Sequence, residues 1–306
     1  MKIRIISVIQ IFITAFLLIG SQYDSYSQEA DSISVVKPGL FIGINFGPSQ
    51  TLISIKGILS VANLVSNSQN SFGGVLEVGY FFSKSIGVSS GIGFSSYKSQ
   101  LELVTYQNKF NTTDSENETY ERRVSGTNIK ELQKIGFLSI PVCLDIRLPL
   151  SKKMEFFLQT GINLAIPVTK KYTGSGIFTY KGYYPAYNVL LENLPAYGFP
   201  SNINGVTNGT LQIKSVNINV LASAGFDFII QKNIQIGVGV SYSKSLSNIS
   251  DYASPDKFQL SSDANQINSM MGGSNKATVQ SIGLNIRLRY FLWSGFRKSG
   301  GNVRDY

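Results

Sequence analysis

Residues 281–290 read Ser-Ile-Gly-Leu-Asn-Ile-Arg-Leu-Arg-Tyr, so apolar side chains alternate strictly with small or polar ones. A period of two places successive side chains on opposite faces of an extended strand. One face is continuously apolar, formed by Ile282, Leu284, Ile286, Leu288 and Tyr290. The other face carries Ser281, Gly283, Asn285, Arg287 and Arg289. This segment is therefore predicted to be a β-strand with apolar surroundings on one side and a polar interior on the other.

Seven other segments of about ten residues repeat this alternation. They lie at residues 40–47, 75–82, 86–95, 138–148, 155–166, 216–230 and 234–243. Short connections at 83–85, 149–153 and 231–233 alternate with long ones at 49–71, 108–130, 169–212 and 247–276. The pattern predicts an all-β fold: an eight-stranded antiparallel up-and-down transmembrane β-barrel with four long extracellular loops and both termini in the periplasm.

A soluble β-sandwich is the alternative, because its strands also alternate. Here the apolar faces are almost unbroken, and the opposite faces are rich in Gly, Ser and Asn. Each segment also supplies the roughly 9–11 tilted residues that a membrane strand needs. The barrel is therefore favoured over the sandwich.

The N-terminus has the pattern of a cleaved signal peptide. Lys2 and Arg4 precede the apolar residues 5–20, and small residues at Ser25 and Ser27 precede a predicted cut before Gln28. A membrane-anchoring helix is the alternative, but it needs roughly 20 apolar residues. The sequence predicts export, and with the alternating strands it predicts an integral protein of the outer membrane.

The predicted organisation has four parts. They are a signal peptide (1–27), a short periplasmic leader (28–37), the outer-membrane β-barrel (38–293) and a periplasmic C-terminal tail (294–306).

Composition argues against several functions. The chain has no histidine, and histidine supplies the general base in most hydrolases and many metal ligands. Cys143 is the only cysteine, so no intramolecular disulfide forms. The net charge of +9 comes from Lys and Arg residues scattered singly rather than gathered in a patch. We expect no enzyme, no catalytic or metal site, no cofactor and no nucleic-acid partner.

One strand carries a family resemblance. Residues 137–141 (Phe-Leu-Ser-Ile-Pro), followed by 142–145 (Val-Cys-Leu-Asp), resemble the aromatic-x-x-Ile-Pro strand of the PorT-like outer-membrane β-barrel family of Bacteroidetes. Phe137 stands where that family commonly has Tyr. The Ser-Tyr-Ser-Gln sequence at 25–28 is also typical of such bacteria. Some members of the family are implicated in protein export across the outer membrane, so the resemblance implies a part in an export apparatus.

The last strand also resembles the signal that the barrel assembly machinery recognises. Residues 281–288 match polar-x-Gly-x-x-apolar-x-apolar, although the chain continues past the aromatic residue on which such barrels usually end. The expected partners are thus the outer-membrane lipids, the assembly machinery during insertion, and a candidate protein partner in the membrane or at the surface.

Seven charged residues fall on the predicted inward faces near the periplasmic rim. They are Glu77, Asp145, Arg147, Glu155, Asp227, Arg287 and Arg289. Buried charges persist when they are paired, so we expect a network of carboxylates and arginines that closes the lower lumen. Small polar residues above it predict a wet pocket, or room for an aromatic loop to fold inward.

The third long connection is rich in tyrosine and poor in charge. Its candidate partner-binding residues are Tyr172, Tyr180, Tyr183, Tyr184, Tyr187 and Tyr197. The alternative is that this loop packs on itself or over the barrel mouth.

Two functions follow from these features. The first is a structural or interaction barrel. The second is a narrow pore for passive transport of small solutes, constrained because eight strands leave an interior that side chains fill.

Overall fold

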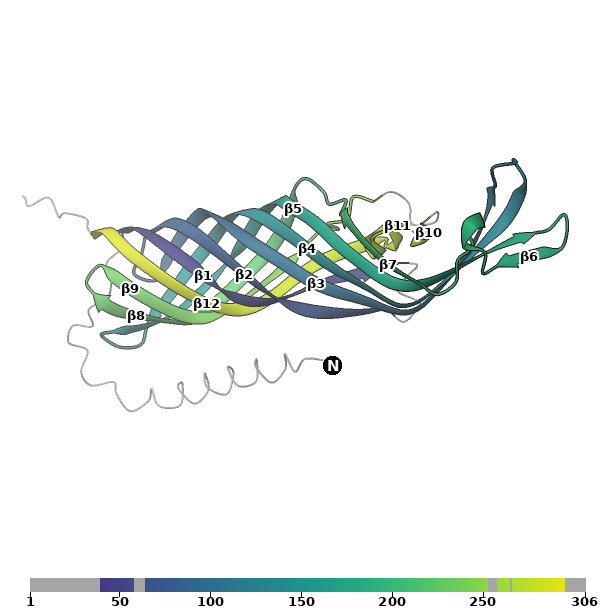
Figure 1. The fold of residues 1–306 in the computed structure, drawn as a ribbon. Helices are drawn as coiled ribbons and strands as arrows, with labels where there is room; N and C mark the ends of the chain where they lie inside the picture. The colour runs from purple at the N-terminus through teal and green to yellow at the C-terminus, as the bar shows by residue number, and fades with distance from the viewer. Residues whose placement is uncertain (1–38, 58–63, 253–257, 265, 295–306) are drawn as a thin grey trace, which may run out of the picture. The chain divides into compact units, whose positions relative to one another are not determined.

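The computed structural model describes residues 39–57, 64–252, 258–264 and 266–294. Eight long antiparallel strands form its body: β1 (Gly39–Lys56), β2 (Leu64–Phe81), β3 (Ile86–Thr113), β4 (Thr119–Pro149), β5 (Met154–Tyr184), β8 (Asn217–Gln231), β9 (Ile234–Ser245) and β12 (Lys276–Ser294). Each of these strands pairs with its neighbours in the chain, and β12 pairs with β1 to close the ring (Figure 1). The predicted eight-stranded up-and-down barrel is confirmed.

The smaller elements all belong to the long connections. Strands β6 (Val189–Glu192) and β7 (Ile203–Thr210) pair with β5, and β10 (Ser261–Asp263) pairs with β11 (Gln266–Ile267). Two short 3-10 helices are η3 (Pro195–Tyr197) and η5 (Met270–Gly273). No helix within the described residues is long and apolar enough to span a membrane. The predicted signal peptide, leader and C-terminal tail lie outside the described residues, apart from Ser294.

Outward-facing apolar side chains form a belt around the barrel. The belt comprises the outward residues of 40–46, 76–82, 86–94, 138–148, 158–168, 216–230, 236–242 and 284–292. Leu76 and Ile92 are 66% and 63% exposed, and many other belt residues are exposed to a smaller extent. An exposed apolar surface this large indicates contact with lipid. The belt matches the faces that the alternation predicts.

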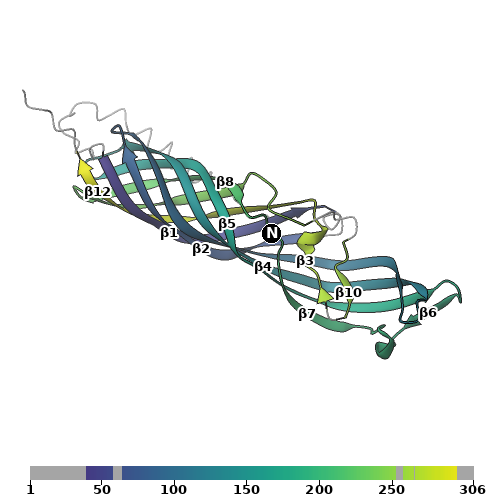
Figure 2. The same ribbon diagram turned by 90° about the horizontal axis from the view of Figure 1, so that it is seen from above.

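Three strands continue far beyond the belt. β3, β4 and β5 contain 28, 31 and 31 residues, about three times what a membrane crossing requires. Their distal parts (104–113, 119–127 and 173–184) form an open sheet with β6 and β7, which we call the extension (Figure 2). Much of the predicted loops at 108–130 and 169–212 is therefore strand, and so is most of the predicted loop at 49–71, because β1 extends to Lys56 and β2 begins at Leu64.

A break in the alternation explains why the sequence does not predict these longer strands. The pairing of β4 with β5 shifts register between Thr127 and Lys130, and Asn128 adopts a left-handed φ of 53°. A bulge of this kind exchanges the inward and outward sets of side chains. The period of two is thus lost at the bulge, although hydrogen bonding continues beyond it.

Candidate functional site

An aromatic layer closes the lumen at the end with the short turns. Phe41, Phe81 and Phe291 project inward from β1, β2 and β12 and are almost fully buried. Their ring centroids lie 5.5–6.2 Å apart. Arg147 lies over the Phe81 ring, 3.9 Å from its centroid, and donates through Nε to the carbonyl oxygen of Lys84 at 2.7 Å. These contacts leave little free space at this end of the barrel.

The seven predicted lumen charges lie next to this layer, and none is more than 7% exposed. Arg289 occupies a central position among them. Its Nε donates to Glu77 Oε1 at 2.7 Å and its Nη2 donates to Asp145 Oδ1 at 2.6 Å. One guanidinium from β12 therefore joins carboxylates from β2 and β4 across the lumen. We call these seven residues the charge layer.

Arg287 forms the second ion pair of this layer. Its Nε donates to Asp227 Oδ1 at 2.7 Å, its Nη2 contacts the other carboxylate oxygen, and its guanidinium lies 3.4 Å from the centroid of Phe157. Gly237 provides the necessary space, because a Cβ there would lie 2.2 Å from Asp227 Oδ1 and 2.6 Å from Arg287 Cγ. A glycine on β9 thus allows the pair to form.

Neutral polar side chains complete the layer, and the sequence did not identify them as part of it. Gln159 Nε2 donates to Asp145 Oδ1 and to Ser89 Oγ, each at 3.2 Å, and Ser89 donates to Asp145 Oδ2. Gln235 Nε2 donates to Glu155 Oε2 at 3.0 Å. The strand register could have identified Gln159 as part of the layer, because Gln159 is the cross-strand partner of Asp145.

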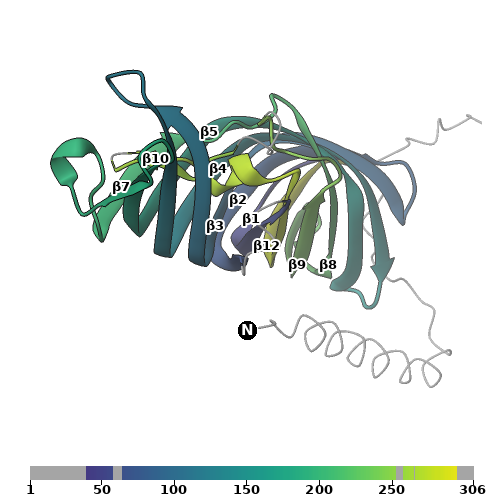
Figure 3. The same ribbon diagram turned by 90° about the vertical axis from the view of Figure 1, so that its right-hand side faces the viewer.

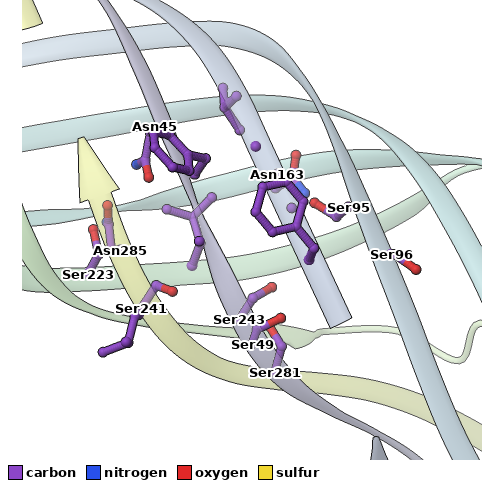
Figure 4. Close-up of a pocket in the computed structure, with 18 of the residues that line it drawn as sticks. Asn45, Ser49, Ser95, Ser96, Asn163, Ser223, Ser241, Ser243, Ser281 and Asn285 are labelled. Atoms are coloured by element: carbon purple, nitrogen blue, oxygen red, sulfur yellow. The ribbon is translucent and has the colours of Figure 1, made fainter. Parts of the chain in front are cut away.

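A small polar cavity lies beyond the charge layer, away from the short turns (Figure 4). Its volume is about 160 Å³, which is enough for several water molecules. Its polar lining includes Asn45, Ser49, Ser95, Asn163, Ser223, Ser241, Ser243, Ser281 and Asn285. The Oδ1 atoms of Asn163 and Asn285 are buried and accept no hydrogen bond from the described residues. These two oxygens can bind water or a small polar solute.

The fourth long connection closes the mouth of the barrel. Residues 258–264 and 266–274, here called the cap, insert Leu260, Ile267, Met270 and Met271 among inward-facing apolar residues of the strands. Figure 3, seen from the side of the extension, shows this segment crossing the ring. The cavity thus lies between the charge layer and the cap.

Tyrosines from the extended strands hold the cap. The hydroxyl of Tyr106 accepts from Leu260 N at 3.0 Å, and that of Tyr172 donates to Ile267 O at 3.1 Å. The Tyr180 hydroxyl lies 2.7 Å from Ser261 Oγ. Tyr172 and Tyr180 are therefore buried, which corrects their assignment to an exposed partner-binding loop. The segment that folds inward belongs to the fourth connection and not to the predicted third.

Glu131 also binds the cap and is only 1% exposed. Its carboxylate accepts from Ser269 Oγ at 2.8 Å, from Met270 N at 2.5 Å and from Gln133 Nε2 at 2.5 Å. Burial raises the pKa of this carboxyl to about 7, although the three donors act in the opposite direction. Glu131 lies seven residues beyond Leu138, the nearest outward belt residue of β4, and thus outside the membrane-spanning segment.

This carboxyl should make cap docking depend on pH. When the cap leaves, Glu131 becomes hydrated and its pKa returns towards 4.5, so the docked state holds a proton that the open state releases. Docking should weaken by about 3 kcal/mol as pH rises from 4.5 to 7 and stay constant above that. Burial keeps the pKa of the neighbouring Tyr172 and Tyr252 above the ordinary 10, so both remain neutral.

Amide exchange at Met270 and Met271, corrected for the intrinsic pH effect, measures cap opening. Glu131→Gln should remove the pH dependence while keeping the acceptor for Met270 N. A parent protein whose cap opens equally often at pH 5 and pH 7.5 would contradict the assignment.

The other four predicted tyrosines lie at the far end of the extension. Tyr184 donates to Asp114 Oδ2 at 3.0 Å and stacks on Tyr120 with centroids 5.1 Å apart. Tyr187 donates to Glu118 Oε1 at 2.6 Å, and Tyr183 donates to Asn188 Oδ1 at 3.0 Å. Residues Tyr187 and Tyr197 remain 61% and 74% exposed. We call residues 114–118 and 183–199 the tip.

Potential metal ligands are dispersed in the described part of the chain. It contains no group of three or more Cys, Asp or Glu side chains placed to hold a metal ion. Cys143 is buried and faces inward from β4. The arrangement supports closure of the lumen and exposure of aromatic groups at the tip.

Comparisons with known proteins agree with this architecture. Residues 22–251 match the family model described as outer membrane protein beta-barrel domain. The comparison with curated protein sequences gave no significant match.

Three solved structures with a similar fold are distant in sequence. Neisserial surface protein A, from Neisseria, is 10% identical, with 83% of this chain and 97% of that chain covered and a TM-score of 0.35. OprG from Pseudomonas aeruginosa is 15% identical, with 83% of this chain and 96% of that chain covered and a TM-score of 0.34. The attachment invasion locus protein Ail of Yersinia pestis is 11% identical, with 82% of this chain and 99% of that chain covered and a TM-score of 0.28. These similarities concern barrel architecture and say nothing of activity.

Proposed function

Since this chain belongs to the outer membrane protein beta-barrel domain family, we propose that it is a closed barrel whose extension binds a partner at the cell surface. The protein is an outer-membrane β-barrel in a lipid environment. The observation that carries the proposal is the continuation of β3, β4 and β5 far beyond the apolar belt, with exposed tyrosines at the end. Barrel closure alone requires no such extension.

The lengths of the connections support the orientation. Outer-membrane barrels have short turns on the periplasmic side and long connections outside. In this chain β2–β3, β4–β5 and β8–β9 are joined by short turns at one end, and the extension and cap lie at the other. The tip would then lie in the extracellular medium, and both ends of the barrel sequence would lie in the periplasm.

The chemistry of the tip suits contact with a protein. Tyrosine gives a large, rigid contact area with a polar group, and it is enriched at energetically important interface positions. Here the rings are held in place, because Tyr184 and Tyr187 donate to the carboxylates of Asp114 and Glu118. Arg123 further lies over Tyr183, 4.6 Å from its centroid. A preorganised surface loses less conformational entropy on binding.

A structural or interaction role is consistent with the absence of histidine and with the closed lumen. The resemblance of residues 137–145 to the PorT-like family suggests protein export across the outer membrane as the setting. The partner would then be another component of that apparatus. Assembly would use the barrel assembly machinery, with residues 281–288 as the recognised strand.

The test is capture of a partner from native membranes with the full-length tagged protein after cross-linking. Tyr187→Ala with Tyr197→Ala should reduce capture at least 30-fold, since removal of a central interface residue typically costs about 2 kcal/mol or more. Val206→Ala is the matched control, because it removes an exposed apolar side chain from β7, away from the tip. Equal capture by the double variant and the control would exclude the tip as the binding surface.

A narrow pore is the second candidate, and the polar cavity favours it. The Oδ1 atoms of Asn163 and Asn285 offer unfilled hydrogen-bonding capacity to a solute. Transport would require both the cap and the charge layer to move. Steady conductance of the wild-type protein in planar bilayers, combined with failure to capture any partner, would favour this function over the first.

A further inference from the structure

Three lysines lie directly opposite one another on the outer surface of the barrel. Lys98 of β3 pairs with Lys134 of β4, which pairs with Lys171 of β5. Inward-facing residues flank each lysine along its strand, and all of them are buried except Lys170, which is half-buried, so the three side chains point outward. We call them the lysine row. Like charges placed directly opposite destabilise a sheet, so this row has a cost for folding.

A second row of cations farther along the same strands provides a comparison. Lys109, Arg123 and Lys181 are also direct cross-strand partners. This upper row has carboxylates beside it. Glu121 lies 2.7 Å from Arg123 and 3.8 Å from Lys109, and Glu192 pairs with Lys181.

The lysine row has no such compensation. Among the described residues, no carboxylate lies within ion-pair distance of Lys98, Lys134 or Lys171. Glu102, farther along β3, is the cross-strand partner of Lys130 instead. The counter-ion of the row must therefore come from outside the described chain.

The position of the lysine row indicates the source of its counter-ion. The last exposed belt residues before it are Phe94, Leu138 and Val168, only three or four residues away along each strand. At roughly 3.3 Å per residue and a tilt near 40°, the ammonium-bearing residues lie about 8–10 Å beyond the belt. The headgroup region extends roughly 5–8 Å beyond the hydrocarbon on each side, so the long lysine side chains on these residues can reach it.

We propose that the lysine row binds the phosphate groups of a phosphorylated glycolipid in the outer leaflet. The lipid would place its acyl chains against Leu138 and Val168 and its phosphates among the three ammonium groups. A headgroup with two phosphates suits the row better than a zwitterionic lipid, because it neutralises several adjacent cations. The upper row needs no such ligand, since Glu121 and Glu192 already lie beside it.

Lipid retention by the full-length protein tests the proposal. The protein is placed in phosphatidylcholine nanodiscs containing either a bis-phosphorylated diglucosamine lipid or its dephosphorylated form, and bound lipid is counted by native mass spectrometry after extraction. The parent should retain the phosphorylated lipid at least 10-fold better. The triple variant Lys98→Gln, Lys134→Gln, Lys171→Gln should lose this preference.

The matched control removes the upper row: Lys109→Gln, Arg123→Gln, Lys181→Gln should keep the preference. In neutral detergent, the lysine-row variant should unfold at the same temperature as the parent or higher, because repulsion is relieved; a purely structural role would lower it. Equal retention by parent and lysine-row variant overturns the proposal. Complete displacement of the lipid by 10 mM inorganic phosphate overturns the assignment to a glycolipid.

Discussion

Arg289→Met should destabilise the barrel by about 3–5 kcal/mol, because it leaves buried carboxylates without their cation. Glu77 and Asp145 both receive hydrogen bonds from this guanidinium, at 2.7 and 2.6 Å, and both are almost fully buried. Arg287→Leu strands Asp227 alone and should cost less. The midpoint of unfolding in urea, followed by the mobility shift of the folded barrel on gels, measures both effects.

Neutralising the stranded groups separates burial of charge from loss of packing. Adding Glu77→Gln and Asp145→Asn to Arg289→Met should recover most of the lost stability, since neutral amides cost far less to bury than carboxylates. Arg122→Met is the control, because Arg122 lies in the extension. If Arg289→Met and Arg122→Met unfold at the same urea concentration, the charge layer does not stabilise the barrel.

Replacing residues 258–273 by a Gly-Ser linker should increase access to the polar cavity by a factor of ten or more without opening a channel. The cap packs on inward-facing residues at one end of the cavity. The charge layer and the ring of Phe41, Phe81 and Phe291 close the other end. Because these closures share no residues, removal of one should leave the other intact.

A thiol in the cavity wall measures this access. Ser241→Cys in a Cys143→Ser background places one cysteine at the cavity, and its rate of modification by a membrane-impermeant maleimide is compared with and without the cap. Bilayer recordings on the same proteins should show no added conductance. Equal modification rates would exclude the cap as a barrier, and conductance in the capless protein would exclude the charge layer as a seal.

Local alternation was sufficient for the barrel itself. The segments around 40–47, 138–148 and 281–290 each place apolar and polar residues on opposite faces, and lipid on one side with a packed lumen on the other requires this arrangement. The same alternation placed all seven charged residues inside. The burial and the depth of each charged side chain depend on its position within one strand, and that position can be read from the sequence.

The sequence did not predict which arginine pairs with which carboxylate. That Arg289 joins Glu77 and Asp145, whereas Arg287 joins Asp227, depends on the register between strands far apart in the chain. The pairing also depends on free space, because Gly237 leaves room for the ion pair formed by Arg287. Neither register nor free space is a property of a single segment.

Strand number and the inward or outward direction of each side chain could thus be predicted from the sequence, because both depend on a local period of two and on the surroundings of each strand face. The tertiary structure alone decided the length of β3, β4 and β5, the identity of the cap and the burial of Tyr172 and Tyr180. Bulges such as the one near Asn128 interrupt the period without ending the hydrogen bonding. The choice of segment that fills the mouth depends on which one fits the apolar surface of the assembled strands, and that surface exists only after the ring has closed.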